Sequence, residues 1–332
     1  MKRLYIGTYT RNTESRGIYC CDWDAASGTF SGLTLAARAD NPSFLVAHGS
    51  TLLAANEVTD FRGQEQGAVS SYRITSAGLE LSAMLPSHGA DPCHLAVGDG
   101  EVAVANYSGG TVARLALAHG VLTRTRTVVR FAGTGPHRRQ ASAHPHGVYY
   151  HGGELLVADL GGDCVHRLRQ HGNHSLAPLR VAAGSGPRHL AIAASGRIYV
   201  VNELANTVDV LEHGHSVQTV TTLPAGAAPG SSNSFTAEIA LNAAEDRLLV
   251  SNRGHDSLVS WPLDAATGRL GEPAFCPTGG RSPRHFLIDP AGWIIVANQA
   301  SDSLTTRQLM PDGTFGTAGD SLLVPSPVCI AG

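Results

Sequence analysis

The stretch GPRHLAIAASGRIYVVNEL, residues 186–204, contains the pattern that decides the fold. It starts at an anchor, Pro187, and its aliphatic run ends in a polar residue, Asn202. The same order occurs five more times, with the polar residue 14 to 16 positions after an anchor at Pro42, Pro92, Pro145, Thr236 or Pro283. The aliphatic runs are LLAAN (52–56), VAVAN (102–106), LLVAD (155–159), IYVVN (198–202), LLVSN (248–252) and IIVAN (294–298). This regularity identifies an internal repeat, which is typical of folds built from several copies of one structural unit.

Each repeat contains four strand-like segments. A third run with alternating polarity follows the polar residue, as in AVSSYRI (68–74), and a less hydrophobic fourth run comes next, as in TRTRTVV (123–129). The anchors stand 42 to 53 residues apart. Four-stranded units of roughly 40–50 residues are typical of β-propeller blades. We therefore predict an all-β, seven-bladed β-propeller with four antiparallel strands per blade, forming one domain over residues 1–332.

The two ends of the chain are predicted to share one blade. Six continuous blades fit between about residue 42 and residue 326. The seventh combines the C-terminal PVCIAG (327–332) with residues 1–41, which contain LYIGT (4–8) and GIYCCDW (17–23). Pairing these segments closes the ring and removes the exposed strand edges that an open array would leave.

Composition and charge exclude several classes of function. Glycine is abundant (38 residues), only 15% of residues are charged, and the net charge is −3 without a long run of one sign, so no nucleic-acid surface or basic membrane face is expected. The N-terminus lacks the apolar core of a signal peptide, and no later segment resembles a membrane span. The six cysteines are scattered, as expected for reduced thiols. We expect a cytoplasmic protein, a monomer or a dimer.

The predicted topology gathers ionisable residues at one mouth of the central channel. In each blade the innermost strand begins at one face and the second strand returns to it. Residues after the anchors, and residues after the Asn or Asp, should therefore crowd the same mouth. After the anchors these are His94, His146, Arg188, His189, Glu238, Arg284 and His285; after the polar residues they are Glu57, Tyr107, Glu203, Arg253 and Gln299.

The motifs together resemble the lactonase family of seven-bladed propellers, which includes propeller-type 6-phosphogluconolactonases. The resemblance rests on the order and spacing of GPRH, VNELANTVDVL (201–211), TAEIAL (236–241), SNRGHDS (251–257) and PRHFLIDPAGWIIVANQ (283–299), and it covers nearly the whole chain. It implies that His146, Arg188, Glu203 and Arg253 form the catalytic set, with Arg284 and His285 as an extension. We add His189, His94 and Glu238 as candidate substrate-binding residues.

The resemblance implies hydrolysis of a sugar lactone, 6-phosphoglucono-δ-lactone to 6-phosphogluconate, in the pentose phosphate pathway. Either Glu203 or His146 would activate water, Arg188 would stabilise the oxyanion, and Arg253 and Arg284 would bind the anionic group. No cofactor and no metal are required. His144 and His146 could face one way on a strand and bind zinc, but no third ligand is evident.

Two alternatives remain open at this stage. The same residues could catalyse ring closure, as in carboxymuconate-type lactonising cyclases, or the propeller could bind a ligand or a protein without catalysis. The polar groups occupy inner-strand positions instead of a broad top surface, which favours a small-molecule pocket and a small anionic lactone as the partner.

Overall fold

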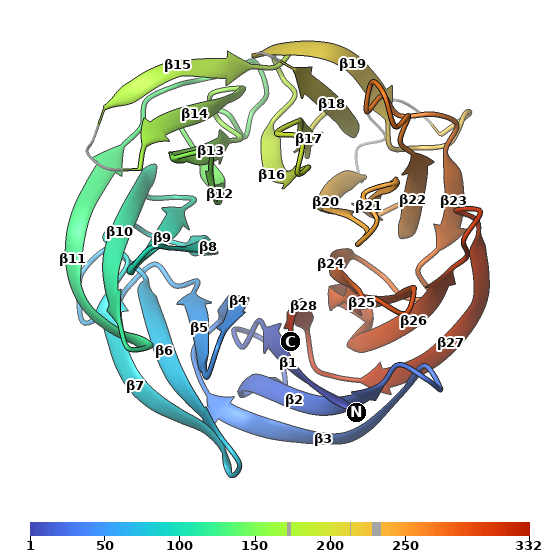
Figure 1. Ribbon diagram of the computed structural model, residues 1–332. Coiled ribbons are helices and arrows are strands. Elements are labelled where there is room, and N and C mark those ends of the chain that lie inside the picture. Colours follow the sequence, from blue (N-terminus) through green and yellow to red (C-terminus); the bar gives the residue numbers. More distant parts are fainter. Residues whose placement is uncertain (171–173, 213, 228–233) are drawn as a thin grey trace.

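Seven four-stranded antiparallel sheets surround a central axis in the computed structural model, which describes residues 1–170, 174–212, 214–227 and 234–332. Figure 1 looks along this axis, with one strand of each sheet near the centre and one at the rim. Among the described residues the only helix is the short 3-10 turn η1 (Gln299–Ser301). The predicted all-β seven-bladed propeller is confirmed.

Six blades follow one another along the chain, each running from the axis to the rim. Blade 1 contains β4 (Pro42–His48), β5 (Thr51–Asn56), β6 (Ala68–Thr75) and β7 (Gly78–Pro86). Blade 2 contains β8 (Pro92–Gly98), β9 (Glu101–Asn106), β10 (Thr111–Ala118) and β11 (Val121–Arg130). Blade 3 contains β12 (Pro145–His151), β13 (Glu154–Asp159), β14 (Cys164–Arg169) and β15 (Ser175–Arg180). Blade 4 contains β16 (Pro187–Ile192), β17 (Ile198–Asn202), β18 (Thr207–Glu212) and β19 (His215–Thr221). Blade 5 contains β20 (Phe235–Leu241), β21 (Arg247–Arg253), β22 (Ser257–Pro262) and β23 (Ala274–Pro277). Blade 6 contains β24 (Pro283–Ile288), β25 (Trp293–Asn298), β26 (Ser303–Leu309) and β27 (Phe315–Leu323).

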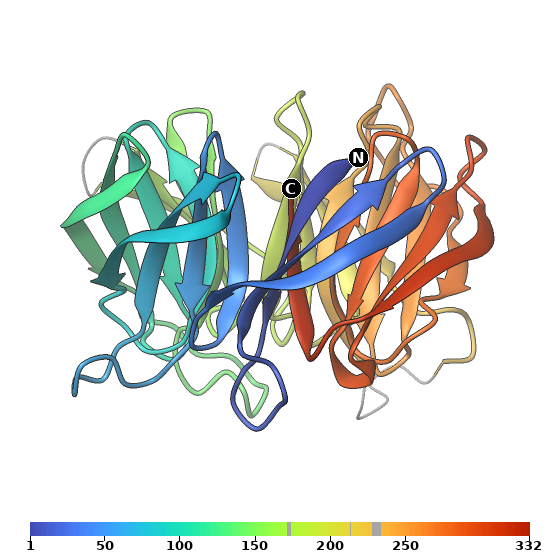
Figure 2. The same cartoon turned by 90° about the horizontal axis from the view of Figure 1, so that it is seen from below.

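Blade 7 is built from both ends of the chain. Its inner strand is β28 (Pro327–Ala331), followed by β1 (Lys2–Thr8), β2 (Gly17–Asp24) and β3 (Thr29–Arg38). The strands β1 and β28 pair antiparallel, with Ile6 opposite Ile330. The two ends therefore lie side by side, as Figure 2 shows in the edge-on view. This pairing closes the ring as the sequence predicted.

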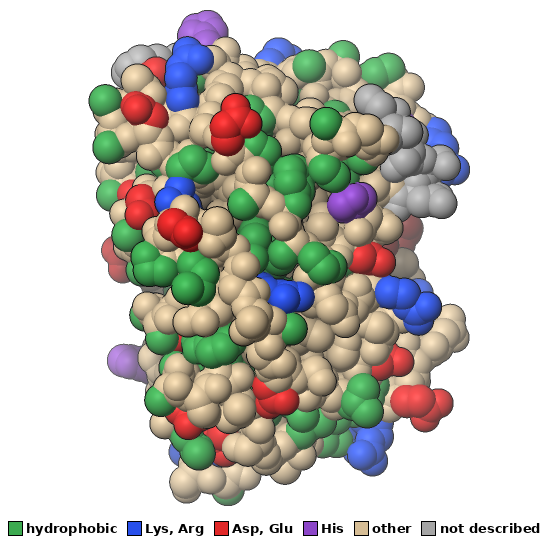
Figure 3. All heavy atoms as spheres, turned by 90° about the vertical axis from the view of Figure 1, so that its right-hand side faces the viewer, with side chains coloured by type: hydrophobic (Ala, Val, Ile, Leu, Met, Phe, Trp, Pro, Cys, Tyr) green, Lys and Arg blue, Asp and Glu red, His purple; other side chains and the backbone are tan. Residues whose placement is uncertain are grey.

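Apolar seams between neighbouring blades form the core. Between blades 4 and 5, for example, Val201 and Val208 pack in one cluster with Val250 and Trp261, all of them buried. Burying such side chains contributes roughly 25 cal/mol per Å² of apolar surface, and it fixes each blade against the next. Figure 3 shows basic and acidic side chains interspersed over one outer side of the molecule, without a patch of one sign. No helix in the described ranges is long and apolar enough to cross a membrane.

A β-bulge follows the anchor of each inner strand in blades 1 to 6. In blade 4, Pro187 pairs with Asn202 but the next pair is His189 with Val201, which leaves Arg188 as the extra residue. The same shift occurs in β4, β8, β12, β20 and β24. A bulge re-aims the side chain of the extra residue. Consecutive residues after an anchor can therefore both turn toward the channel.

The Asn residues that end the second strands connect neighbouring blades. The Asn106 side-chain amide donates to the Ser87 carbonyl, and that of Asn252 donates to the Thr222 carbonyl, each at 2.8 Å. Both asparagines are fully buried. These residues satisfy buried loop carbonyls, which gives the repeated polar position a structural reason.

Candidate active site

Glu203 occupies the turn after β17 and is surrounded by three arginines. Its backbone N–H donates to the Gly186 carbonyl at 2.7 Å, and only 1% of the residue is exposed. Arg139 Nη1 lies 2.5 Å from Oε1, while Arg253 Nη2 and Arg188 Nε lie 2.9 and 3.0 Å from Oε2. The cluster joins the loop before blade 3 to the inner hairpin of blade 4 and to the end of β21 in blade 5.

The arginines keep this carboxylate ionised. Burial alone would raise the pKa of Glu203, but Arg253, Arg139 and Arg188 outweigh it and lower the pKa to about 2. A carboxylate with so low a pKa accepts a proton poorly near neutral pH, because an effective general base has a pKa near the working pH. Oε2 nevertheless receives no well-directed hydrogen bond from the described residues. This buried oxygen is instead stabilised by its ion pairs with Arg188 and Arg253.

A cavity of about 240 Å³ opens beside Glu203 at the anchor end of the channel. Its lining residues are Tyr9, Glu57, Cys93, Tyr107, Arg139, His146, Glu203, Arg253 and Arg284. The expected lining residue Gln299 lies further out, in a surface pocket that shares Tyr9, Glu57 and Tyr107 with the cavity. Most of the predicted set thus meets at one mouth.

Arg284 is the cation of this cavity that is left available for a ligand. Its guanidinium stacks over the Tyr9 ring, with 5.1 Å between the guanidinium carbon and the ring centroid. The Tyr9 hydroxyl donates in turn to the Glu57 carboxylate at 3.0 Å. No carboxylate oxygen of a described residue lies within 4.0 Å of the Arg284 nitrogens. Arg284 is thus oriented by an aromatic ring without being neutralised by an ion pair.

The cavity carries an excess of positive charge. Four arginines (139, 188, 253 and 284) surround two glutamates (57 and 203), which leaves two positive charges unbalanced. In a site shielded from water these charges act more strongly than at a surface. The arrangement therefore favours an anionic ligand.

His146 presents a neutral imidazole to the same cavity. It is 5% exposed, and its Nε2 lies 3.8 Å from Glu203 Oε2, beyond direct hydrogen-bonding distance. Burial lowers the pKa of His146 well below 6.5, and the nearby Arg188 and His189 lower it further. At neutral pH the ring therefore has a free lone pair and can accept a proton.

Arg139 was missed in the sequence-based set. Its loop is held by Gln140, which is fully buried and donates to the Leu160 carbonyl and the Asp163 carboxylate at 2.8 and 2.7 Å. Arg139 then reaches Glu203 and also donates to the Tyr107 hydroxyl at 3.1 Å. The signal was the basic PHRRQ segment (136–140) shortly before HPHG (144–147), but it stands outside the repeat.

Arg188 supports the site from outside the cavity lining. It is 3% exposed, its Nε faces Glu203, and its Nη1 donates to the Ala237 carbonyl at 2.7 Å. Arg253 is similarly fixed, because its Nη2 donates to the Thr236 carbonyl at 2.9 Å. Arg188 thus stabilises the position of Glu203, whereas Arg253 also lines the cavity.

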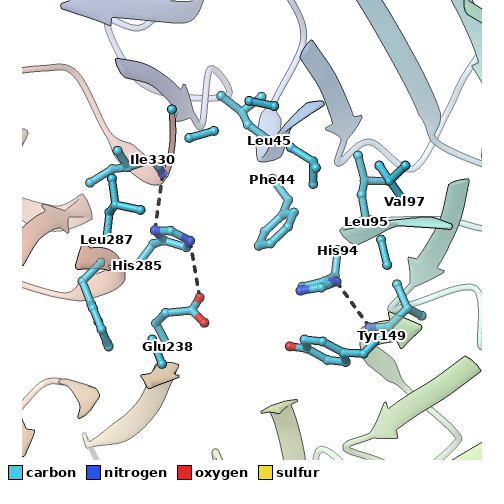
Figure 4. Close-up of a pocket in the computed structure, with 18 of the residues that line it drawn as sticks. Phe44, Leu45, His94, Leu95, Val97, Tyr149, Glu238, His285, Leu287 and Ile330 are labelled. Carbon is cyan, nitrogen blue, oxygen red and sulfur yellow. Dashed lines mark hydrogen bonds and ion pairs between the residues drawn. The ribbon is translucent and has the colours of Figure 1, made fainter. Parts of the chain in front are cut away.

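Three of the predicted substrate-binding residues lie elsewhere. His94, Glu238 and His285 line a second pocket of about 760 Å³, whose walls are the later residues of the inner strands. Figure 4 shows their side chains pointing into this pocket, where His285 Nε2 lies 3.6 Å from Glu238 and His94 Nδ1 accepts a hydrogen bond from the Val148 N–H. The prediction that all anchor residues share one mouth is wrong for these three.

His189 lies in the wall between the two cavities. Its Nδ1 is 3.1 Å from Glu238 Oε2, and its ring centroid is 4.8 Å from that of His94 and 5.4 Å from that of His146. Burial lowers the pKa of His189 and of His94 well below 6.5, so both rings are neutral. The bulge explains the separation, because it places residues i+1 and i+2 of each anchor at successive depths along the channel.

His144 does not join His146 as a metal ligand. Its ring stacks on Tyr107, with centroids 4.4 Å apart, and its Nδ1 lies 2.9 Å from the Tyr107 carbonyl oxygen. In the part of the chain that the structure describes, three metal-binding side chains come together only at Asp159, Cys164 and His166. His144 is thus held against Tyr107, and the described residues place no third ligand beside it and His146.

The protein is thus a ring of seven blades with a small, cation-rich cavity at one mouth of its channel. Residues 3–331 match the family model described as Lactonase, 7-bladed beta-propeller. The 6-phosphogluconolactonase of Bacillus subtilis is 30% identical, with 98% of this chain and 97% of that protein aligned. The 6-phosphogluconolactonase of Formosa agariphila is 29% identical, over 91% of this chain and 90% of that protein. The solved periplasmic gluconolactonase PpgL of Pseudomonas aeruginosa superimposes with a TM-score of 0.90 at 31% identity, covering 99% of this chain and 98% of its own.

The chain belongs to this lactonase family of seven-bladed β-propellers. The resemblance that the motifs suggested is confirmed, and so is the class of enzyme, a lactonase.

Proposed function

We propose that this protein hydrolyses a sugar lactone that carries an anionic group, and that its substrate is 6-phosphoglucono-δ-lactone. The observation that carries the proposal is the pairing, in one cavity, of a carboxylate held by three arginines with a fourth arginine that forms no ion pair with any described residue. The relatives named 6-phosphogluconolactonase support the same substrate.

Size and charge of the cavity support a phosphorylated monosaccharide. Ligand pockets usually enclose about 300–1,000 Å³, so a cavity of about 240 Å³ suits a single sugar ring better than a polymer. The excess of positive charge matches a phosphate. Arg284 is the side chain we assign to that group, because it lines the cavity and its guanidinium is not already neutralised.

His146 is the general base in this scheme. Water attacks the lactone carbonyl carbon while His146 Nε2 takes one of its protons, and the carbonyl oxygen becomes an oxyanion. The ring carbon–oxygen bond then breaks, and the proton returns from His146 to the leaving alkoxide, so that lactone and water give the hydroxy acid. We prefer His146 to Glu203 because both carboxylate oxygens of Glu203 are held in ion pairs with arginines, whereas His146 Nε2 lies 3.8 Å from that carboxylate, beyond hydrogen-bonding distance.

Glu203 and the arginines support this chemistry electrostatically. The ionised Glu203, 3.8 Å from His146 Nε2, stabilises the imidazolium that forms transiently. Arg139 and Arg253 line the cavity and are fixed before the substrate arrives, so they can stabilise the oxyanion without reorganising. Arg188 acts indirectly, by holding Glu203 in place, and not as the oxyanion donor that the sequence suggested.

Direct assay of hydrolysis tests the proposal. We expect the wild-type protein to accelerate opening of 6-phosphoglucono-δ-lactone at mildly acidic pH, where spontaneous hydrolysis is slow, and we expect His146→Gln and Glu203→Gln to lose most of this activity. Arg138→Ala is the matched control, because Arg138 is exposed next to Arg139. If the wild type does no better than buffer, the proposed substrate is wrong.

A further inference from the structure

Blade 3 departs from the other blades at the polar residue that ends the second strand. Blades 1, 2, 4, 5 and 6 have an asparagine there, whereas blade 3 has Asp159. In blade 1 this asparagine, Asn56, accepts a hydrogen bond from the Ser70 hydroxyl at 2.6 Å. The residue of blade 3 that corresponds to Ser70 is His166, two positions after Cys164, the partner of Asp159 across the strand pair. The repeat thus places an aspartate, a cysteine and a histidine where blade 1 has Asn56, Ala68 and Ser70.

The three side chains converge. His166 Nε2 lies 2.9 Å from Asp159 Oδ2 and 3.6 Å from Cys164 Sγ. One ligand atom of each residue lies within 4.8 Å of those of the other two. In a tetrahedral zinc site, Zn–S bonds of about 2.3 Å and Zn–N bonds of about 2.0 Å place sulfur and nitrogen roughly 3.5 Å apart. The observed separation of Cys164 and His166 is close to that value.

The surroundings leave one carboxylate oxygen available and orient the histidine. Asp159 Oδ1 accepts hydrogen bonds from the backbone N–H groups of His144 at 2.7 Å and Gly161 at 3.0 Å, whereas its Oδ2 faces His166. The Phe131 ring stacks on His166 with centroids 4.3 Å apart. Neighbouring groups that orient the metal-binding side chains in this way are typical of metal sites.

Two glycines pack closely beside the cluster. A Cβ at position 162 would lie 2.6 Å from Asp159 Oδ2 and 3.6 Å from Cys164 Sγ. Another glycine, Gly133, lies on the same side, where a Cβ would come 3.7 Å from Oδ2. A side chain at position 162 would therefore collide with Asp159, so the close approach of this segment to the cluster requires glycine. The histidine, 18% exposed in its side chain, gives access from solvent.

We propose that Asp159, Cys164 and His166 bind one Zn²⁺ ion, with water as the fourth ligand. A thiolate, an imidazole and a carboxylate together suit zinc better than calcium or magnesium, which prefer oxygen ligands alone. The ion would tie the end of β13 to the start of β14. Because Asp159 also holds the His144 backbone, two residues before His146, it would stiffen the loop that leads into the active site. A catalytic thiol is a poorer interpretation, because Cys164 is only 3% exposed and does not line the active-site cavity.

Zinc binding to the full-length protein tests this proposal, independently of the proposed reaction. Protein stripped with a chelator is titrated with ZnCl₂ by calorimetry, and bound zinc is counted after dialysis. We expect one equivalent to bind the wild type and to raise its melting temperature. Co²⁺ in place of zinc should give the near-ultraviolet absorption of a thiolate–cobalt bond.

Three variants remove one ligand each and should leave the fold intact. Asp159→Asn restores the residue of the other blades, His166→Ser restores the serine of blade 1, and Cys164→Ser is nearly isosteric. Each should weaken zinc affinity by at least about tenfold, and Cys164→Ser should abolish the cobalt–thiolate band. His48→Ser, an exposed histidine on β4, is the control and should bind zinc as the wild type does. The proposal would be overturned if the wild type does not bind one equivalent of zinc. It would also be overturned if all three variants bind zinc with the affinity of the wild type.

Discussion

Arg188 and Glu203 stand at the same end of one hairpin, β16–β17, and their charged groups meet at 3.0 Å. Arg188 is the extra residue of the bulge after Pro187, and Glu203 directly follows Asn202, which pairs with that proline. The contact is therefore set by the local geometry of blade 4. Arg139 and Arg253 then bring the neighbouring segments to the same carboxylate.

Replacing Glu203 should destabilise the fold as well as the site. Glu203→Gln leaves Arg139, Arg188 and Arg253 without their buried counter-charge, and breaking one partner of a buried ion pair costs about 3–5 kcal/mol. We expect a clear drop in the thermal midpoint measured by differential scanning calorimetry. Glu57→Gln is the comparison, since Glu57 is less enclosed and receives a hydrogen bond from Tyr9 instead. Equal midpoints for Glu203→Gln and the wild type would contradict the buried cluster.

The same carboxylate should make stability depend on acid pH. Its pKa is lowered from 4.5 to about 2 in the folded protein, so the unfolded chain binds the proton more readily. This contribution is fully present above about pH 4.5 and is lost as the pH falls toward 2, and it amounts to roughly 3 kcal/mol. Urea midpoints measured between pH 6 and pH 2.5 should fall for the wild type. In Glu203→Gln the decline across this window should be shallower; parallel curves would show that Glu203 is not the titrating group.

The pH dependence of activity should follow His146. Because burial and the nearby arginine keep the pKa of His146 well below 6.5, the neutral ring persists into mildly acidic solution. We expect kcat/KM to stay level from pH 7 down to about 6 and to decline only at lower pH. His146→Gln should reduce kcat by about 10²–10⁴-fold, the usual effect of removing a general base. A loss of activity already centred near pH 6.5 would contradict this assignment.

Arg139 and Arg138 offer a matched pair of adjacent arginines. Arg139 contacts Glu203 and Tyr107 inside the cavity, whereas Arg138 is exposed. Arg139→Ala should lower kcat/KM by about 10- to 100-fold, the value of a charged hydrogen bond of 1.5–3 kcal/mol. Arg138→Ala should leave it unchanged. Steady-state kinetics of both variants separate the role of the side chain from general changes in the loop.

The repeat explains why so much of the architecture could be predicted from the sequence. The anchors and the Asn or Asp positions mark the ends of the inner hairpins, so the seven blades and the pairing of β1 with β28 follow from spacing alone. His146, Glu203 and Arg253 were brought together correctly for the same reason.

The features that could not be predicted are those outside the repeat, such as irregular loops, and those that residue spacing does not define, such as β-bulges and strand register. Spacing does not report a bulge, so Arg284 and His285 were assigned to one mouth although they face different cavities. Arg139 belongs to an irregular loop, whose path depends on the buried contacts of Gln140. The cluster of Asp159 and His166 appears only when the register of β13 and β14 is known.

The central claim, that the cavity recognises an anionic lactone through Arg284, is tested most directly by comparing two substrates. kcat/KM is measured for 6-phosphoglucono-δ-lactone and for glucono-δ-lactone, which lacks the phosphate, in the wild type and in Arg284→Ala. We predict that the wild type prefers the phosphorylated lactone and that the variant loses about 10- to 100-fold on this substrate only. Equal losses on both lactones, or no hydrolysis of either by the wild type, would contradict the account.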